Sequence, residues 1–227
     1  MEPVDGIIAI SSGGFIDLSE TKDNKRPVVF VSGADSVAHP SITRDYALGA
    51  YRVTRDLIKA GHTKIVACPV PGISTAEDAA ILAGYRAAMN RVGLEVDEDA
   101  INLGRSVPLS DLAALRDYIH QFRSATAVFC GSAQRAKDLV RLCDALGVLV
   151  PDDLSVASAG ASAMRDDMTG GQLTGFGFAP IDLAEAAVSM LSGILENGTS
   201  RFSQVKVPPR TYKGHSAGHP RQTKAAR

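Results

Sequence analysis

Short apolar runs alternate along the chain with longer segments whose apolar residues recur at helical spacing. This alternation is typical of a parallel β-sheet with helices on its faces. The predicted strands are runs rich in β-branched and small apolar residues, at 6–10, 28–31, 64–68, 127–130 and 154–157. Because sheets of this kind bind ligands beyond the carboxyl ends of their strands, we expect functional residues to follow directly after these runs.

The predicted helices are segments that carry a single apolar stripe, at 47–58, 80–88, 112–122, 136–143 and 184–195. Gly61 follows the first of them and is a typical helix stop. Ser110 and Ser132 precede the third and the fourth, where a serine hydroxyl caps the free amides of a helix start. The sequence therefore predicts an α/β protein of the doubly wound type.

Composition and charge limit the classes of partner. The chain has 227 residues, of which 45% are hydrophobic and 22% charged, with a formal net charge of -1. This length suits one large domain or two small ones. A near-neutral charge does not attract nucleic acid or an anionic membrane, and no apolar run approaches the roughly 20 residues of a membrane-spanning helix. We therefore expect a globular protein with no membrane partner and no direct nucleic-acid partner.

The cysteines and the two chain ends indicate the compartment. Cys68, Cys130 and Cys143 are odd in number and lack Cys-x-x-Cys spacing, which argues against a disulfide framework and against a zinc site. The amino terminus has an acidic residue where a secretory signal carries lysines. Both features favour a reducing cytoplasm. Residues 214–227 are rich in Gly, Ser, Pro and basic residues, which predicts a loose tail.

Signatures of catalysis are missing from the sequence. It contains no Walker A loop and no Gly-x-Ser-x-Gly elbow, and the pair Gly175 and Gly177 lacks the third glycine of a dinucleotide loop. Residues 11–14 (SSGG) could cradle a phosphate, but acidic residues follow them, so we favour a plain turn. None of the five histidines stands with a carboxylate or cysteine at metal-ligand spacing. The sequence predicts no enzyme, no metal and no cofactor.

The segment 45–67, DYALGAYRVTRDLIKAGHTKIVA, resembles the LacI/GalR repressors, whose core has an Asp, a Gly-Ala helix and then Leu-Ile-x-x-Gly-His before a strand. The resemblance continues over nearly the whole chain, at 5–8 (DGII), 27–29 (PVV), 84–87 (GYRA), 126–130 (TAVFC) and 146–156 (LGVLVPDDLSV). It implies a periplasmic-binding-protein-like core, normally a homodimer, with a small-molecule effector between two α/β subdomains. It also implies a preceding helix-turn-helix head, so that operator DNA would be contacted by that head and by no residue of this chain.

The resemblance places Met1 near the third strand of the family's amino-terminal subdomain, which we therefore expect to be incomplete, as in a fragment. Residues 1–62 with 176–205 are expected to form this partial subdomain. Residues 63–175 with 206–213 are expected to form the carboxyl-terminal subdomain, and 214–227 a disordered tail.

The residues that grip a sugar in the family are replaced in this chain. The family's charged positions correspond to Ile81, Ala133 and Gly160, the last followed by Ala161. A polyol that binds without bidentate charged partners loses more free energy in desolvation than its apolar faces regain. A typical free sugar is therefore not the expected effector.

Three possibilities remain for the pocket: a less polar ligand, a ligand held by amides and hydroxyls, or no ligand. Ser132, Gln134 and Ser158 are the candidate polar contacts. Phe178 either stacks on a ring of the ligand or is a core phenylalanine.

The function predicted from the resemblance is the effector-sensing and dimerising core of a LacI-type transcriptional regulator, or repressor, with an atypical pocket. The alternative is the solute-binding protein of a transporter, which shares the fold. The missing signal sequence and the match to repressor motifs argue against this alternative. An enzyme on a doubly wound sheet is a more remote alternative.

Overall fold

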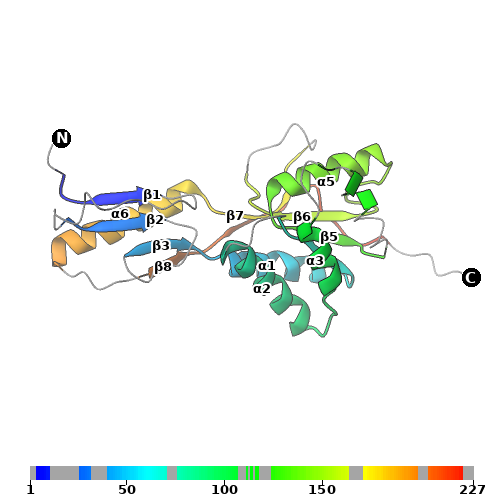
Figure 1. Ribbon diagram of the computed structural model, residues 1–227, viewed down its shortest axis with the longest axis horizontal. Coiled ribbons are helices and arrows are strands. Elements are labelled where there is room, and N and C mark those ends of the chain that lie inside the picture. Colours follow the sequence, from blue (N-terminus) through cyan, green and yellow to red (C-terminus); the bar gives the residue numbers. More distant parts are fainter. Residues whose placement is uncertain are drawn as a thin grey trace, which may run out of the picture. The chain divides into compact units, whose positions relative to one another are not determined.

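The structure is a computed structural model that describes residues 4–10, 26–31, 40–70, 76–106, 111, 113–114, 116–117, 124–163, 171–198 and 204–221 (Figure 1). The chain divides into two compact units. Unit 1 comprises Met1–Asp45 and Phe178–Pro209, and unit 2 comprises Tyr46–Gly177 and Arg210–Arg227. No helix among the described residues is long and apolar enough to cross a membrane.

Unit 1 is a four-stranded parallel sheet in the order β1-β2-β3-β8, with one long helix packed on it. Its elements are β1 (Ile7–Ile10), β2 (Val28–Val31), β3 (Ser41–Arg44), α6 (Pro180–Asn197) and β8 (Gln204–Val207). Proline at the first helical position begins α6, and Gly198 ends it in the left-handed conformation with φ 61. Leu183 and Ala187 of α6 pack with strand residues such as Val29 and Ile42 to form the core.

Unit 2 is built on a five-stranded sheet in the order β4-β5-β6-β7-β9. The first four strands are parallel, and β9 pairs antiparallel with β7. The strands are β4 (Ile65–Cys68), β5 (Ala127–Cys130), β6 (Ser155–Ala159), β7 (Thr174–Gly177) and β9 (Arg210–Tyr212). The carboxyl ends of β4, β5 and β6 therefore meet at one edge of this sheet.

Helices cover both faces of the unit 2 sheet (Figure 1). Helix α5 (Ala133–Ala145) packs over β5 and β6, and α3 (Glu98–Ser106) packs beside β4. Helix α1 (Tyr46–Lys59) packs against β7 on the other face and against α2 (Ala76–Arg91). A Cβ on Gly84 would lie 2.1 Å from the carbonyl oxygen of Ala47, so the backbones of α1 and α2 approach closely at this glycine.

The alternating pattern located most of these elements. All five predicted strands correspond to β1, β2, β4, β5 and β6, and four predicted helices correspond to α1, α2, α5 and α6. The predicted helix 112–122, its cap Ser110 and the turn at 11–14 lie largely outside the described residues. The strand list omitted β3, β7, β8 and β9, and the helix list omitted α3, because these elements are short or weakly apolar.

The subdomain boundaries differ from the expected ones at α1. The expected division assigned residues 1–62 to the amino-terminal subdomain, but Tyr46–Lys59 is part of unit 2. The physical reason is packing: the buried face of α1 contacts α2, and Gly49 of α1 lies against the ring of Phe176 in β7. Likewise the return to unit 2 occurs at Arg210 rather than at 206.

The expectation of a loose tail is wrong for residues 214–221. This segment is fixed to the sheet of unit 2, because Ser216 is 7% exposed and its hydroxyl donates to the carbonyl oxygen of Val156 at 2.7 Å. The amide of Val156 donates in turn to the carbonyl oxygen of Ser216 at 2.6 Å. Arg221 donates to the carboxylate of Asp153 at 2.7 Å. We call residues 213–221 the C-terminal strap; residues 222–227 lie outside the described residues.

Candidate functional site

The carboxyl edge of the unit 2 sheet includes the ends of three adjacent strands. Cys68 ends β4, Cys130 ends β5 and Ala159 ends β6. A Cβ on Gly131 would lie 3.2 Å from the Cα of Pro69, so the segments that leave β4 and β5 lie against each other. The residues expected to bind an effector follow these ends, as the sequence argument required.

Helix α5 begins at this edge. Ser132 is its N-cap, and the Ser132 hydroxyl accepts from the amide of Arg135 at 3.2 Å, which confirms the predicted cap. Gln134 is exposed, and its Nε2 donates to a carboxylate oxygen of Asp138 at 3.0 Å. The first turn of α5 contains no acidic residue. The edge therefore presents the positive amino end of a helix dipole without a carboxylate in that turn.

Two of the replaced sugar-gripping positions lie next to each other. A Cβ on Gly160 would lie 3.6 Å from the Cβ of Ala133, and Gly160 has a φ of +77. Ala161 is buried, and its amide donates to the carbonyl oxygen of Phe176 at 2.9 Å. The structure thus brings Ala133 and Gly160 together with Ser132 and forms a small, neutral surface.

The remaining predicted residues lie elsewhere. Ser158 is 0% exposed in β6, one position below the end of the strand, and its hydroxyl has no hydrogen-bond partner. Ile81 is 6% exposed within α2. Phe178 belongs to unit 1, where it packs against the core around Leu183. This position agrees with the interpretation of Phe178 as a core phenylalanine. The roles of these residues in binding an effector stay predictions.

A buried cation at this edge was missed by the sequence argument. Arg135, in the first turn of α5, is 0% exposed, and its Nε donates to the Sγ of Cys68 at 3.1 Å. The signal was present in the helical pattern, because Arg135 stands four residues before Leu139 on the stripe that α5 buries. A charged residue on such a stripe marks a position where the core holds a polar group.

His62 lies between the end of α1 and the start of β4. Its ring is 1% exposed; Nε2 lies 3.1 Å from the carbonyl oxygen of Gly218, and Nδ1 lies 2.8 Å from the hydroxyl of Thr126. Because a carbonyl oxygen only accepts, Nε2 carries the hydrogen and Nδ1 accepts from Thr126. Burial lowers the pKa of His62 from 6.5, and the charge of His219 acts in the same direction.

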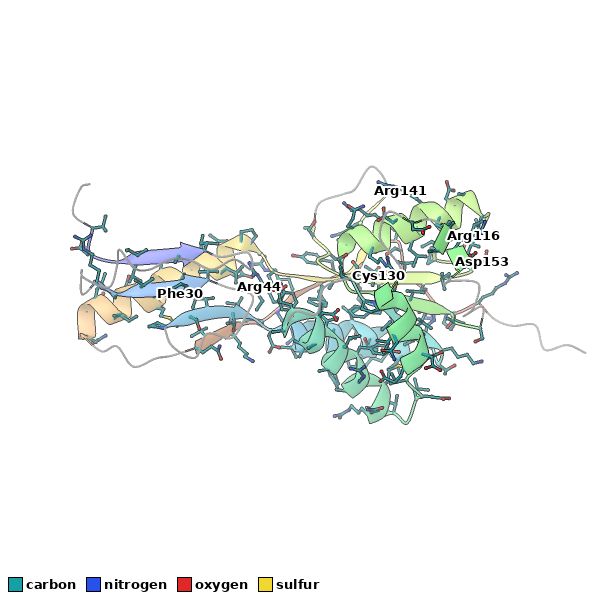
Figure 2. All side chains as sticks on the ribbon, viewed as in Figure 1. Phe30, Arg44, Arg116, Cys130, Arg141 and Asp153 are labelled. Atoms are coloured by element: carbon teal, nitrogen blue, oxygen red, sulfur yellow. The ribbon has the colours of Figure 1, made fainter. Side chains whose placement is uncertain are left out.

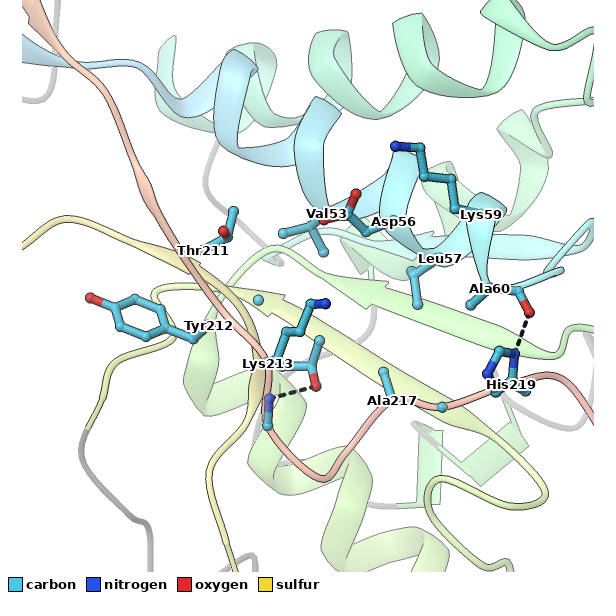
Figure 3. A pocket seen from close by; sticks show the side chains of 14 residues that line it. Val53, Asp56, Leu57, Lys59, Ala60, Thr211, Tyr212, Lys213, Ala217 and His219 are labelled. Atoms are coloured by element: carbon cyan, nitrogen blue, oxygen red, sulfur yellow. Dashed lines mark hydrogen bonds between the residues drawn. The ribbon is translucent and has the colours of Figure 1, made fainter.

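A cavity of about 560 Å³ lies in unit 2 between α1, β7 and the C-terminal strap (Figure 3). Dashed lines in the figure mark the bond from the imidazole of His219 to the carbonyl oxygen of Ala60 and the bond from the Gly214 amide to Thr174. Thr174 is the first residue of β7, so the cavity adjoins the amino end of this strand. None of the predicted effector contacts lines it.

Among the described residues, no group of three or more His, Cys, Asp or Glu side chains could hold a metal ion. Two buried thiols of unit 2 have raised pKa values. Burial raises the pKa of Cys143, in the last turn of α5, to about 11. At the carboxyl edge, a hydrogen bond to Cys68 together with burial raises the pKa of Cys130 well above 9.0.

The periplasmic binding protein-like domain family matches residues 54–217. Catabolite control protein A of Priestia megaterium is 27% identical over 209 residues, which are 91% of this chain and 63% of that protein. The HTH-type transcriptional repressor PurR of Klebsiella pneumoniae subsp. pneumoniae is 31% identical over 169 residues, 74% of this chain and 49% of that protein. The chain therefore spans 49–63% of the length of these two relatives.

The crystal structure of a transcription regulator from Lactobacillus plantarum superposes with a TM-score of 0.78 at 23% identity, and covers 96% of this chain and 82% of that one. The predicted α/β fold of periplasmic-binding-protein type is thereby confirmed, as is the resemblance to LacI-type regulators. The PurR relative is named as a transcriptional repressor and the Lactobacillus plantarum protein as a transcription regulator.

Proposed function

Because this chain belongs to the family of periplasmic binding protein-like domains, we propose that it is the effector-sensing and dimerising core of a LacI-type DNA-binding transcriptional regulator. One observation carries the proposal: catabolite control protein A matches 91% of the chain. A match over 209 residues is longer than unit 2 and therefore extends into unit 1. A transporter's solute-binding protein has no comparable support.

Such a core acts through a change in the arrangement of its subdomains and not through a chemical reaction. An effector shifts the equilibrium between arrangements only as far as its affinity for them differs. In a dimeric regulator this shift alters the spacing of two helix-turn-helix heads, which read symmetric half-sites one helical turn apart. The chain described above would supply the effector contacts and the dimer contacts, and the heads would supply the DNA contacts.

The proposed effector contacts lie at the carboxyl edge of unit 2, where Ser132, Ala133, Gln134 and Gly160 meet. None of these four residues carries a charge, so they cannot hold a polyol through bidentate ion-dipole contacts. The amides at the start of α5 remain available as donors. The proposed effector is therefore less polar than a free monosaccharide and makes its polar contacts to backbone amides, to Gln134 and to Ser132.

Thermal-shift screening of the 227-residue chain tests the class of effector. A ligand at a hundred times its Kd adds about 2.7 kcal/mol of apparent stability. We expect no shift with common hexoses and pentoses, and a shift with at least one less polar metabolite. A clear shift with an ordinary hexose would contradict the proposed effector class while leaving the regulator function intact.

A chimera tests the regulator function itself. The helix-turn-helix head of a PurR relative is fused ahead of Met1, and the same head fused to its own core is the positive control. We expect the chimera to be a dimer and to bind the relative's operator, because dimerisation presents two heads to two half-sites. A chimera that stays monomeric, or that fails to bind the operator under conditions where the control binds, argues against the proposal.

A further inference from the structure

The cavity between α1, β7 and the C-terminal strap has no part in the proposed regulator function. Its volume of about 560 Å³ is within the range of small-molecule sites, and all its lining residues belong to unit 2. It adjoins Thr174 at the amino end of β7, which is parallel to β6. The proposed effector contacts follow the carboxyl ends of the strands, so the cavity lies at the opposite end of the sheet.

The wall that the strap contributes is fixed by hydrogen bonds at both ends of the strap. At its start, the amide of Gly214 donates to the hydroxyl of Thr174 at 3.1 Å. At its end, Arg221 donates to the carboxylate of Asp153, which Figure 2 labels, at 2.7 Å. Folded proteins contain few voids larger than a water molecule. A cavity of this size with a fixed wall is therefore a candidate binding site.

Positive charge exceeds negative charge on the lining of the cavity. Asp56 is the acidic lining residue, and its carboxylate accepts from the guanidinium of Arg55 at 2.9 Å, so its charge already has a counter-ion. Within the described part of the chain, the ammonium groups of Lys59 and Lys213 form no ion pair. Lys59 comes from α1 and Lys213 from the strap (Figure 3), so each wall contributes one cation. Such a lining attracts an anion.

The rest of the lining combines apolar groups with one further polar atom. Val53 and Leu57 of α1 and Ala217 of the strap contribute methyl groups. The Nδ1 of His219 donates to the carbonyl oxygen of Ala60 at 2.9 Å, which leaves the other ring nitrogen for a ligand. An organic anion suits this lining better than an inorganic one, because it buries apolar surface in addition to forming charge-assisted hydrogen bonds.

We propose that the cavity binds a small organic carboxylate, whose oxygens accept from Lys59 and Lys213 and whose apolar body packs against Val53 and Leu57. Two cations on the lining of one cavity repel each other, and a bound anion offsets this repulsion. The site needs only the fold of unit 2. It is therefore independent of the proposed regulator function, which the operator binding of the chimera tests separately.

The first test is a calorimetric titration of the 227-residue chain with aromatic and branched aliphatic monocarboxylates, benzoate and isovalerate among them. Each acid is compared with its neutral amide, and inorganic phosphate is included. We expect at least one carboxylate to bind, with one molecule per chain. Its amide should bind about tenfold more weakly or less, because it lacks the charge. Phosphate should also bind more weakly than the carboxylate, because it buries no apolar surface.

Lysine variants locate the bound carboxylate. Lys213→Met and Lys59→Met each remove one cation and keep a long apolar side chain, and each should raise the Kd about tenfold. Lys64→Met is the matched control, because it makes the same change at an exposed lysine of unit 2 that does not line the cavity. It should change the Kd by less than about twofold. All three lysines are exposed, so the variants should fold, which circular dichroism checks.

Ala133→Asp separates the cavity from the effector edge. A carboxylate in the first turn of α5 repels an anion from that edge but lies outside the cavity, so this variant should bind the carboxylate as the wild type does. The proposal is overturned if no carboxylate binds, if an amide or phosphate binds as tightly, or if Ala133→Asp abolishes binding. It is also overturned if Lys213→Met and Lys59→Met have no greater effect than Lys64→Met.

Discussion

The imidazole of His62 donates to the carbonyl oxygen of Gly218, a residue 156 positions later in the chain, at 3.1 Å. This bond ties the loop after α1 to the C-terminal strap. The strap is further held by the amide of Gly218, which donates to the hydroxyl of Ser155 at 3.0 Å. Residues whose composition is that of a loose tail are thus part of the folded core of unit 2.

The first prediction concerns the pH dependence of stability. Burial lowers the pKa of His62 below 6.5, so the unfolded chain takes up a proton at this residue before the folded chain does. The contribution of the neutral ring is therefore complete above pH 6.5 and is lost as the pH falls from there through the folded pKa. We expect the thermal midpoint of the wild type to fall between about pH 7.5 and about pH 5.

His62→Gln should show a smaller fall over the same range, because glutamine does not titrate. His215→Gln is the matched control: His215 lies in the same strap but is exposed, so this variant should follow the wild type. An equal pH-dependent fall in His62→Gln and the wild type would show that other groups cause it.

The second prediction concerns the anchoring of the strap by Ser216. Its hydroxyl donates to the carbonyl oxygen of Val156 at 2.7 Å and accepts from the amide of Thr174 at 2.9 Å. Ser216→Ala removes both hydrogen bonds, of which the one to Val156 is buried and the one to Thr174 is part-buried, and this should lower the free energy of unfolding by about 1–3 kcal/mol. Urea denaturation measures this change. Ser124→Ala, at an exposed serine of unit 2, should change it by less than about 0.5 kcal/mol.

The C-terminal strap shows which parts of the fold can be predicted from the sequence and which cannot. Periodicity located α1, α5 and α6 because each buries one apolar stripe over several turns. It failed for the strap, which is held by hydrogen bonds to distant residues, and for β9, which is only three residues long. Ser216 and Gly218 carry no local signal of this, since their partners Val156 and Ser155 are about sixty positions away.

The candidate site likewise contains residues that the sequence located and contacts that it did not predict. Ser132 was identified correctly as a cap because its partner is three residues away. Arg135 and Cys68 were not connected, because the contact joins α5 to β4 across 67 positions. The sequence placed Ala133 and Gly160 at the same edge because each follows a predicted strand, but only the structure shows that a side chain at one would touch the other.

The third prediction concerns the open edge of unit 1. Among the described strands, β1 pairs only with β2, and Ile10 at its end is 75% exposed. An apolar strand edge of this kind promotes pairing with other chains. Ile10→Lys should therefore reduce self-association beyond a dimer. Light scattering measures this as a smaller rise of the mean molar mass with increasing protein concentration.

Val92→Lys is the control for this experiment, because it makes the same change of charge at an exposed valine of unit 2, which is 54% exposed. If both lysine variants reduce association equally, net charge rather than the strand edge is responsible.

The last prediction compares two glycines within helices. A Cβ at position 84 would lie 2.1 Å from the carbonyl oxygen of Ala47 and 3.0 Å from the Cβ of Ala50, so α1 and α2 would have to move apart. Gly84→Ala should therefore lower the free energy of unfolding by about 1–3 kcal/mol, in spite of the better helix propensity of alanine.

A Cβ at Gly193 of α6 meets no atom within 4 Å. Only the helix propensity then changes, and it is higher for alanine than for glycine. Gly193→Ala should therefore raise the free energy of unfolding of unit 1 by about 0.5–1 kcal/mol. Urea denaturation of the two variants and the wild type measures both effects. Changes of the same sign would mean that the close approach of α1 and α2 does not determine the need for glycine at position 84.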